Sequence, residues 1–363
     1  MIDLTALVTL GWDAGWLESF APHAAEGRRP GRVVAVHRET SVVRDGQGDR
    51  AATVSGSFRF AALAHVDFPT VGDWVALDAD VITAILPRRS SFTRMASDRS
   101  RRGSGLDDEQ VMASNIDLAL LVAGLDNDLN LRRIERYLAV AWSSGITPVV
   151  VLNKSDLADD VDGRLVAVDA IAPGVSAIPV SARTGAGLDE LRRHLRPGTT
   201  AAILGSSGVG KSTLVNALLG EDRQATAEVR DGDSRGRHTT THRELFELPG
   251  GALLVDTPGI RSLEVLGADE GVDAAFDDVA DIAATCRFSD CRHQSEPGCA
   301  VRAALADGRL SEERLASHRK LERELARAAR ETDPRARAEY RRTWKIIHKS
   351  VSDHMQRKYG GDT

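Results

Sequence analysis

Residues 205–213 read Gly-Ser-Ser-Gly-Val-Gly-Lys-Ser-Thr, a run in which glycines precede a lysine and two hydroxyl side chains. The spacing matches G-x-x-x-x-G-K-[S/T], the phosphate-binding loop of P-loop proteins. In that loop glycines allow successive backbone N–H groups to face one anion, Lys211 can reach the β- and γ-phosphates, and the Ser212 hydroxyl can bind Mg²⁺. The alternative is a glycine-rich turn that binds nothing. Because apolar runs at 200–204 and 212–219 predict the strand and the helix that the loop needs, the pattern favours a nucleotide site.

A second motif, Asn153-Lys-Ser-Asp156, follows the apolar run 147–152. A carboxylate at the end of a buried strand can accept hydrogen bonds from the N1–H and the N2 amine of guanine, and adenine offers neither donor. Asp156 would therefore select guanine, because adenine would leave its carboxylate buried and unpaired. Lys154 can lay its alkyl stem over the base, and Asn153 can tie this loop to the phosphate loop. These four letters also occur in ordinary polar turns, but beside a P-loop they predict a guanine site.

Three further segments complete the predicted site. Ser181-Ala182 follows the next apolar run, where a backbone N–H can contact the guanine O6. The polar segment 233–242 contains three successive threonines, one of which, taken here as Thr240, would supply a second hydroxyl on the Mg²⁺ side. Asp256-Thr-Pro-Gly259 follows another apolar run, so that Asp256 can hold Mg²⁺ through water and the Gly259 N–H can sense the γ-phosphate. The predicted GTP-binding residues are Asn153, Lys154, Ser155, Asp156, Ser181, Ala182, Gly205, Ser206, Ser207, Gly208, Val209, Gly210, Lys211, Ser212, Thr213, Asp256 and Gly259.

The three cysteines of the chain all lie between residues 286 and 299. Together with a histidine they form C-x4-C-x-H-x5-C, with ligands Cys286, Cys291, His293 and Cys299. Thiolates and imidazole are the ligands of structural zinc, and a set of four leaves no open position for catalysis. Three reduced cysteines beside a coincidental histidine are the alternative. The odd number of cysteines and their clustering favour a reducing compartment and a structural zinc site.

The elements around these motifs predict a multidomain chain. Short β-type runs at 32–37, 51–60, 71–77 and 81–86 predict a small barrel, with the OB-fold as the leading topology. From Asn115 strands alternate with helices, which predicts a mostly parallel α/β sheet. A single amphipathic helix is expected over 10–20, and a mostly helical segment from Ala303. The predicted divisions are an N-terminal extension at 1–29, an OB-type barrel at 30–90, a basic linker at 91–112, an α/β GTPase domain at 113–265 and a zinc-binding helical domain at 266–363.

Composition limits the functions to consider. A hydrophobic content of 42% and a charged content of 28% are typical of an ordinary globular protein. The sequence has no basic and apolar leader and no long apolar run, so we expect a cytoplasmic protein that does not span a membrane. The net charge of −6 gives no global sign of nucleic-acid binding. Any such surface must be local.

Three segments leave nucleic-acid binding open. An OB barrel can bind nucleic acid through a strand face, but it can equally serve for protein docking or as a spacer. The arginine-rich stretch 87–102 is either a solvated linker or a set of phosphate contacts. The stretch 335–358 carries eight lysines and arginines against two acidic residues, which is consistent with a solvated helix face or with an RNA contact.

The order of the motifs is rearranged. Small GTPases usually run from the P-loop through the threonine switch and D-x-x-G to N-K-x-D, whereas here N-K-S-D and S-A precede the P-loop. The cyclic order is kept and only the cut point has moved, which predicts a circularly permuted domain. The chain after Gly259 would then follow directly from the switch that senses the γ-phosphate.

Taken together, the barrel, N-K-S-D, the P-loop, R-G-R-H-T-T-T, D-T-P-G and the cysteine motif resemble the circularly permuted, ribosome-small-subunit-dependent GTPase A family over nearly the whole chain. The resemblance implies a bacterial cytoplasmic factor in late maturation of the small ribosomal subunit, acting as a monomer. It also implies slow GTP hydrolysis that the subunit stimulates, with Mg²⁺ and one zinc, and rRNA contacts through the barrel and the zinc domain.

The resemblance also bears on hydrolysis. Ras-like enzymes place a water-orienting glutamine after the D-x-x-G glycine, but the residue here is Ile260. The family is thought to use a histidine of the threonine switch, which corresponds to His238, with His242 as a weaker candidate. Lys211 and Thr240 are the other predicted catalytic residues. The main hypothesis is a GTPase that is released from the subunit when it hydrolyses GTP. The alternatives are a GTP-dependent RNA-binding scaffold in which hydrolysis is incidental, and an ATPase.

Overall fold

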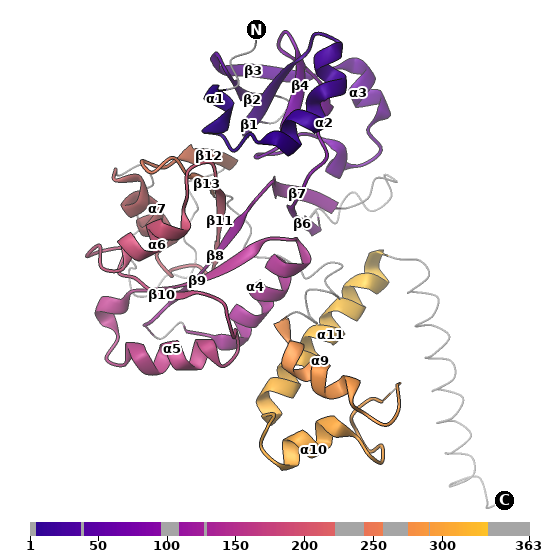
Figure 1. Cartoon of the computed structure of the whole chain (residues 1–363), viewed down its shortest axis with the longest axis vertical. Coiled ribbons are helices and arrows are strands. Elements are labelled where there is room, and N and C mark those ends of the chain that lie inside the picture. The colour runs from indigo at the N-terminus through magenta and orange to yellow at the C-terminus, as the bar shows by residue number, and fades with distance from the viewer. Residues whose placement is uncertain are drawn as a thin grey trace, which may run out of the picture. The chain divides into compact units, whose positions relative to one another are not determined.

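The computed structural model describes residues 5–37, 40–95, 109–126, 129–221, 243–256, 275–289 and 291–332. The chain divides into two compact units, Met1–Glu264 and Val265–Thr363, which are considered separately (Figure 1). Across the described ranges, no helix combines the length and the apolar character needed to cross a membrane.

The predicted barrel is formed by five strands. They are β1 (Arg29–His37), β2 (Thr40–Asp45), β3 (Gly48–Val54), β4 (Trp74–Asp78) and β5 (Val81–Ile85). The pairings β1–β2, β2–β3, β3–β5, β5–β4 and β4–β1 close the sheet on itself. Buried and half-buried positions alternate along β2, as a strand with one face toward a core requires. The barrel core consists of Val33, Val43, Ala52, Val75, Leu77 and Ile82.

One local prediction in the barrel was wrong, and one strand was not predicted. The strand expected over 51–60 ends at Val54, because the Ser55 hydroxyl accepts a hydrogen bond from the Phe58 N–H and caps helix α3 (Gly56–Ala61). Strand β2 was not predicted from the sequence. The polar and apolar residues of β2 alternate over only a short segment directly after β1, a pattern that is also typical of a turn.

The N-terminal segment forms two helices, α1 (Thr5–Val8) and α2 (Ala14–Ala25), instead of the single helix expected over 10–20. The Asp13 side chain accepts a hydrogen bond from the Trp16 N–H, so α2 can begin only after Asp13. Trp12 and Trp16 pack their rings on Trp74 of β4, at centroid distances of 4.7 and 6.1 Å. These aromatic contacts join the N-terminal helices to the barrel.

The α/β part contains the predicted mostly parallel sheet. Its parallel strands run in the order β10-β9-β8-β11-β13, and β12 is antiparallel to β13. The bounds are β8 (Leu118–Gly124), β9 (Thr147–Asn153), β10 (Ala177–Pro179), β11 (Thr200–Gly205), β12 (Arg243–Glu247) and β13 (Leu253–Asp256). The helices are α4 (Leu131–Ser143), α5 (Val161–Asp169), α6 (Leu188–His194) and α7 (Lys211–Leu219).

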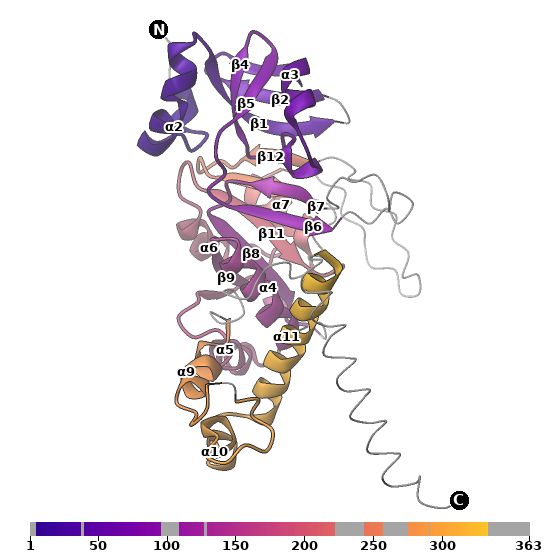
Figure 2. The same ribbon diagram turned by 90° about the vertical axis from the view of Figure 1, so that its right-hand side faces the viewer.

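A backbone connection joins the barrel to this sheet. Strand β1 pairs with β12 in antiparallel register, Ala35 opposite Glu244 and Val36 opposite Arg243. The two parts therefore share one eleven-stranded sheet, in which β12 lies between β13 and the barrel strand β1. Figure 2 shows β12 next to the barrel strands. The ends of the segment predicted as a linker form a hairpin of β6 (Ser91–Met95) and β7 (Glu109–Ser114), and residues 96–108 lie outside the described ranges.

The second unit is helical over the residues that the structure describes. It contains α9 (Asp277–Ala284), α10 (Ala300–Ala306) and α11 (Glu312–Thr332). Arg314 of α11 donates to both carboxylate oxygens of Asp278 and to the backbone oxygen of Ala275, and it lies 4.2 Å over the ring of Phe276. These contacts fasten α11 to the start of α9. The basic stretch 335–358 lies outside the described residues.

Candidate nucleotide site and metal cluster

The phosphate loop connects the fully buried strand β11 to helix α7, which begins at Lys211. Its glycines are required by close packing. A Cβ on Gly205 would lie 2.5 Å from the backbone oxygen of Val122, and one on Gly210 would overlap the side-chain nitrogen of Asn153. Gly208 and Gly210 also have φ of +82° and +88°, which side chains disfavour. The loop therefore presents its backbone at the start of a helix, where an anion binds best.

Lys211 lies across this loop. Its Nζ donates hydrogen bonds to the backbone oxygen of Gly205, at 2.9 Å, and to that of Ser206. The ammonium group is thus held beside the same backbone that would surround a phosphate. A flexible stem lets such a group turn from carbonyl oxygens to phosphate oxygens.

Asn153, at the end of β9, joins three loops and is only 2% exposed. Its side-chain nitrogen donates to the backbone oxygen of Val209 in the phosphate loop at 2.8 Å. Its side-chain oxygen accepts from the backbone N–H of Ala182, after β10, at 3.0 Å. One buried amide therefore fixes the spacing between the loop with Asp156, the loop with Ser181 and the phosphate loop.

Asp156 is placed to act as a hydrogen-bond acceptor. The Ser181 hydroxyl donates to one carboxylate oxygen at 2.6 Å, and Arg183 donates to the other at 2.7 Å. The hydrogen bond from Ser181, with a smaller effect from the charge of Arg183, lowers the pKa of Asp156, so the carboxylate is ionised at neutral pH. Arg183 is 74% exposed, so it can swing away to leave an acceptor for a base.

Two charged residues of this site were not assigned a role from the sequence. Arg183 pairs with Asp156, and Asp126 pairs with Lys154 at 2.5 Å. Lys154 has a left-handed backbone with φ of +64°, which directs its side chain toward Asp126 after β8. The available signal was position: Asp126 follows the carboxyl end of a parallel strand, the edge at which ligands bind in such sheets.

The structure brings together the predicted residues that follow β9, β10 and β11. Asp256 ends β13, and its side chain lies outside the described part. The residues predicted for the switches and for hydrolysis, His238, Thr240 and Gly259, lie outside the described residues.

The cysteine motif forms a cluster in the second unit. The ligand atoms of Cys286, Cys291, His293 and Cys299 all lie within 4.8 Å of one another. The sulfur of Cys286 is 4.0 Å from that of Cys299, and the two lie 3.6 and 3.5 Å from the His293 Nδ1. Ligand atoms about 2.0–2.3 Å from a tetrahedral metal ion are separated by roughly 3.3–3.8 Å. The two distances to His293 fall in this range and the Cys286–Cys299 distance lies slightly above it, so small side-chain shifts would let the cluster hold a metal ion.

The thiols also show why a cation would suit this cluster. Burial, together with the neighbouring Cys299 and Cys286, raises the pKa of Cys291 to about 11. A second thiolate is therefore unfavourable beside the first unless a positive ion neutralises both. Arg319 of α11 donates to the backbone oxygen of His293 at 2.7 Å, and the Cys299 sulfur accepts from the Arg302 N–H at the start of α10. The cluster can hold a metal ion and would tie α10 and α11 to it.

A mostly parallel sheet with N-K-S-D and S-A loops placed before its phosphate loop defines a circularly permuted P-loop GTPase. The family model described as RsgA GTPase matches residues 85–266. The chain is 49% identical to the Small ribosomal subunit biogenesis GTPase RsgA of Opitutus terrae, over 94% of this chain and 96% of that protein. It is 46% identical to the protein of the same name from Streptomyces coelicolor, over 98% and 97%. The chain therefore belongs to the RsgA GTPase family, and it is a GTP hydrolase.

Two solved structures share the fold of this chain. YjeQ from Thermotoga maritima matches with a TM-score of 0.62 and 30% identity, over 82% of this chain and 98% of that chain. YloQ, described as a circularly permuted GTPase, matches in fold with a TM-score of 0.57 and 23% identity, over 81% and 93%.

Replacing Asn153 by alanine tests how far the three loops depend on one amide. Asn153→Ala removes both hydrogen bonds and leaves the buried Val209 oxygen and the half-buried Ala182 N–H without these partners. We expect the free energy of unfolding to fall by about 2–3 kcal/mol and the affinity for fluorescently labelled GDP to fall at least about tenfold. Urea unfolding and fluorescence titration measure the two effects.

Asn130→Ala is the matched control. Asn130 caps α4 by accepting a hydrogen bond from the Arg133 N–H, and it is not part of the loops that follow β9, β10 and β11. This variant should lose about 1 kcal/mol of stability and bind GDP as the native protein does. If Asn153→Ala also bound GDP normally, the bridging role of the amide would be wrong.

Proposed function

We propose that this protein binds the small ribosomal subunit and hydrolyses GTP during late maturation of that subunit, and that hydrolysis releases it. The observation that carries the proposal is the arrangement of N-K-S-D, S-A and the phosphate loop around Asn153, in a chain that matches the proteins named Small ribosomal subunit biogenesis GTPase RsgA over 94% and 98% of its length. We further propose a cytoplasmic monomer, with rRNA contacts through the barrel and the second unit.

We assign the GTP contacts as the sequence analysis predicts them. Asp156 binds the N1–H and N2 amine of guanine once Arg183 has moved aside, and the loop that contains Ser181 and Ala182 supplies a backbone N–H to the guanine O6. The backbone of 205–213 and the Lys211 ammonium bind the phosphates, and the Ser212 hydroxyl, with Thr240, binds Mg²⁺. Asp256 holds Mg²⁺ through water, and the Gly259 N–H contacts the γ-phosphate. The chain division at 29/30, 90/91, 112/113 and 265/266 is part of the same proposal.

The base preference tests the role of Asp156. In Asp156→Asn an amide NH₂ group replaces one carboxylate oxygen. This hydrogen-bond donor would then face another donor, the N2 amine of guanine. We expect GTP affinity to fall at least about 100-fold, and xanthosine triphosphate, which has a carbonyl at that position, to bind better than GTP. Competition titrations with both nucleotides measure this change. Asp159→Asn, at an exposed position near the same loop, is the control and should leave the preference for GTP over xanthosine triphosphate unchanged. If Asp156→Asn also left this preference unchanged, Asp156 would not belong to the base site.

Steady-state GTP hydrolysis with and without purified ribosomal subunits tests the proposed partner. We expect small subunits to stimulate hydrolysis and large subunits not to do so. Because Ile260 cannot orient water, we assign that role to His238, so His238→Ala should lower the stimulated rate at least about 100-fold with nucleotide affinity retained. His242→Ala tests the weaker candidate for the same role, and because we assign the role to His238, this variant should keep the stimulated rate.

The outcomes separate the alternatives. A rate unchanged by either subunit would remove the ribosomal partner and leave a GTPase. If the protein is a scaffold in which turnover is incidental, the His238→Ala variant should dissociate from small subunits as the native protein does. If hydrolysis drives release, the variant should stay bound to the subunit in the presence of GTP.

We propose that the metal of the cysteine cluster is one structural zinc ion. Mass spectrometry of the purified protein should show one zinc per chain, and Cys286→Ser should lose it. Since metal binding and folding are coupled in small metal domains, a chelator should lower the helical signal by circular dichroism while GDP affinity is kept. Ser295→Ala, between the ligands in sequence, should keep the zinc. A full helical signal after zinc removal would contradict a structural role.

A further inference from the structure

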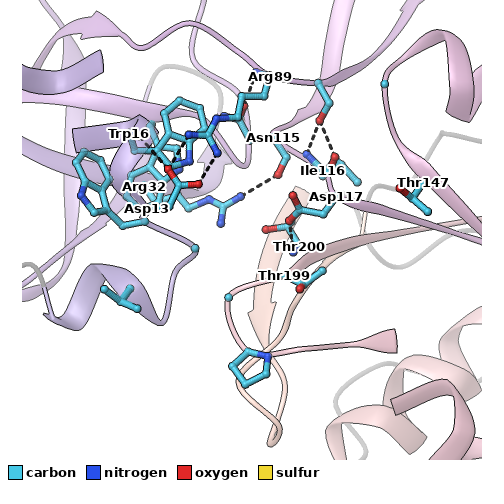
Figure 3. Close-up of a pocket in the computed structure, with 18 residues that line it drawn as sticks. Asp13, Trp16, Arg32, Arg89, Asn115, Ile116, Asp117, Thr147, Thr199 and Thr200 are labelled. Atoms are coloured by element: carbon cyan, nitrogen blue, oxygen red, sulfur yellow. Dashed lines mark hydrogen bonds and ion pairs between the residues drawn. The ribbon is translucent and has the colours of Figure 1, made fainter. Parts of the chain in front are cut away.

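Paired arginines in the first unit differ in how firmly they are held. A pocket of about 530 Å³, which Trp12, Arg32 and Thr200 help to line, lies at the amino edge of the α/β sheet (Figure 3). In its wall Arg89 donates to both carboxylate oxygens of Asp13, at 2.5 and 2.7 Å, and the buried Arg32 guanidinium donates to three backbone oxygens. A ligand would have to break several bonds to use either arginine, so both stabilise the wall.

Arg183, at the carboxyl edge, is held by one bond. Its guanidinium donates to Oδ2 of Asp156 at 2.7 Å and makes no other side-chain hydrogen bond or ion pair within the described ranges. Its side chain is 74% exposed, whereas that of Asp156 is 16% exposed. The other carboxylate oxygen, Oδ1, accepts from the fully buried Ser181. Arg183 therefore approaches the carboxylate from the solvent side, which is the side from which a base must enter.

The backbone around Arg183 does not have to move when this side chain leaves. The Gly185 N–H donates to the backbone oxygen of Ser181 at 2.8 Å, and the Thr184 N–H donates to the Ser181 hydroxyl oxygen at 3.1 Å. These bonds close a tight turn without using the Arg183 side chain. The guanidinium can therefore leave Asp156 and return by rotation of its own side-chain bonds.

Guanine and hypoxanthine differ in what they offer to Asp156. Both have the O6 carbonyl and the N1–H, but only guanine has the N2 amine. These three groups follow one another along the edge of the ring. If O6 faces the loop of Ser181 and Ala182, the N1–H meets Oδ1, which lies beside Ser181, and the amine meets Oδ2, which Arg183 holds. Guanine must then displace Arg183, whereas hypoxanthine leaves it in place.

We propose that Arg183 is a specificity-determining residue, which replaces the N2 amine as the donor to Asp156 when the bound base lacks that amine. The proposal rests on the role proposed above for Asp156 in base binding. A site built to accept a donor normally rejects the analogue without it, because the acceptor stays unpaired. With Arg183 in place the acceptor keeps a charged donor, so the site tolerates hypoxanthine better than the carboxylate alone would.

The proposal predicts the direction of change when Arg183 is removed. In Arg183→Met, water takes the place of the guanidinium on Oδ2, and a neutral donor forms a weaker bond to a carboxylate than a charged one does. Guanine then displaces a weaker partner and gains affinity, whereas hypoxanthine displaces none in either protein. We expect the ratio of the dissociation constants of inosine diphosphate and GDP to rise about two- to fivefold, the range of a partly exposed ion pair.

Competition of GDP and inosine diphosphate against fluorescently labelled GDP, on the full chain, measures this ratio. The ratio is the informative quantity, because loss of a positive charge near the phosphates, or damage to the loop, weakens both nucleotides alike. Arg192→Met is the matched control. It removes an exposed arginine that pairs with Asp189 on α6 at 2.8 Å, and it should leave the ratio unchanged.

Salt provides a second test, since an exposed ion pair is screened as the ionic strength rises. In the native protein the ratio should rise with salt toward that of Arg183→Met, whereas in Arg183→Met it should stay constant. A ratio that is unchanged or lower in Arg183→Met overturns the proposal, as does a native ratio that does not respond to salt.

Asp156→Asn separates this inference from the base site on which it rests. If Asp156→Asn changes the base preference and Arg183→Met leaves the ratio unchanged, only the role of Arg183 is wrong. If neither variant changes the base preference, the base site is wrong and the role of Arg183 falls with it.

Discussion

The parallel pairing of β8, β9, β10 and β11 is the constraint on which the nucleotide site depends. Parallel strands all end at the same edge of a sheet, so the loops that follow them converge whatever their order along the chain. This explains why moving N-K-S-D and S-A ahead of the P-loop leaves the site intact. The Asn153 amide then sets the distances, because it donates to one loop and accepts from another. Circular permutation changes connectivity, whereas the site is made by strand direction and one buried side chain.

The same sheet carries a second set of constraints at its amino edge. Strand β1 extends the sheet through β12, so the barrel is bonded to the GTPase strands by backbone hydrogen bonds. Arg32 adds a fixed point, since its guanidinium binds carbonyl oxygens of the N-terminal segment, the barrel and the segment before β8. Burial lowers the pKa of Arg32 to about 10, against the charges of Asp117 and Asp73, so it remains protonated at neutral pH. A buried cation is tolerated only with partners, which makes the three segments depend on one another.

Charge placement divides the first unit into two chemically different edges. At the carboxyl edge Lys154 and Asp156 are paired with partially exposed partners, Asp126 and Arg183, which can be exchanged for ligand groups. At the amino edge the guanidinium groups of Arg32 and Arg89 are already paired within the protein, with backbone oxygens and with Asp13. The first arrangement leaves partners that a charged nucleotide can replace, whereas the second joins the N-terminal segment, the barrel and the start of the sheet.

The sequence by itself determined the strand, loop and helix around residues 205–213, the guanine motif and the four cluster ligands, because each depends on residues close together in the chain and on a local period. It also indicated the barrel, although β2 and the capped helix α3 were missed, since Ser55 ends the strand by a hydrogen bond that the apolar pattern does not reveal. The tertiary structure decided the pairings of Asp126 and Arg183 and the pocket that contains Trp12, Arg32 and Thr200. These residues are distant in sequence, and only the closure of the barrel, the β1–β12 pairing and the parallel order of the strands bring them into contact.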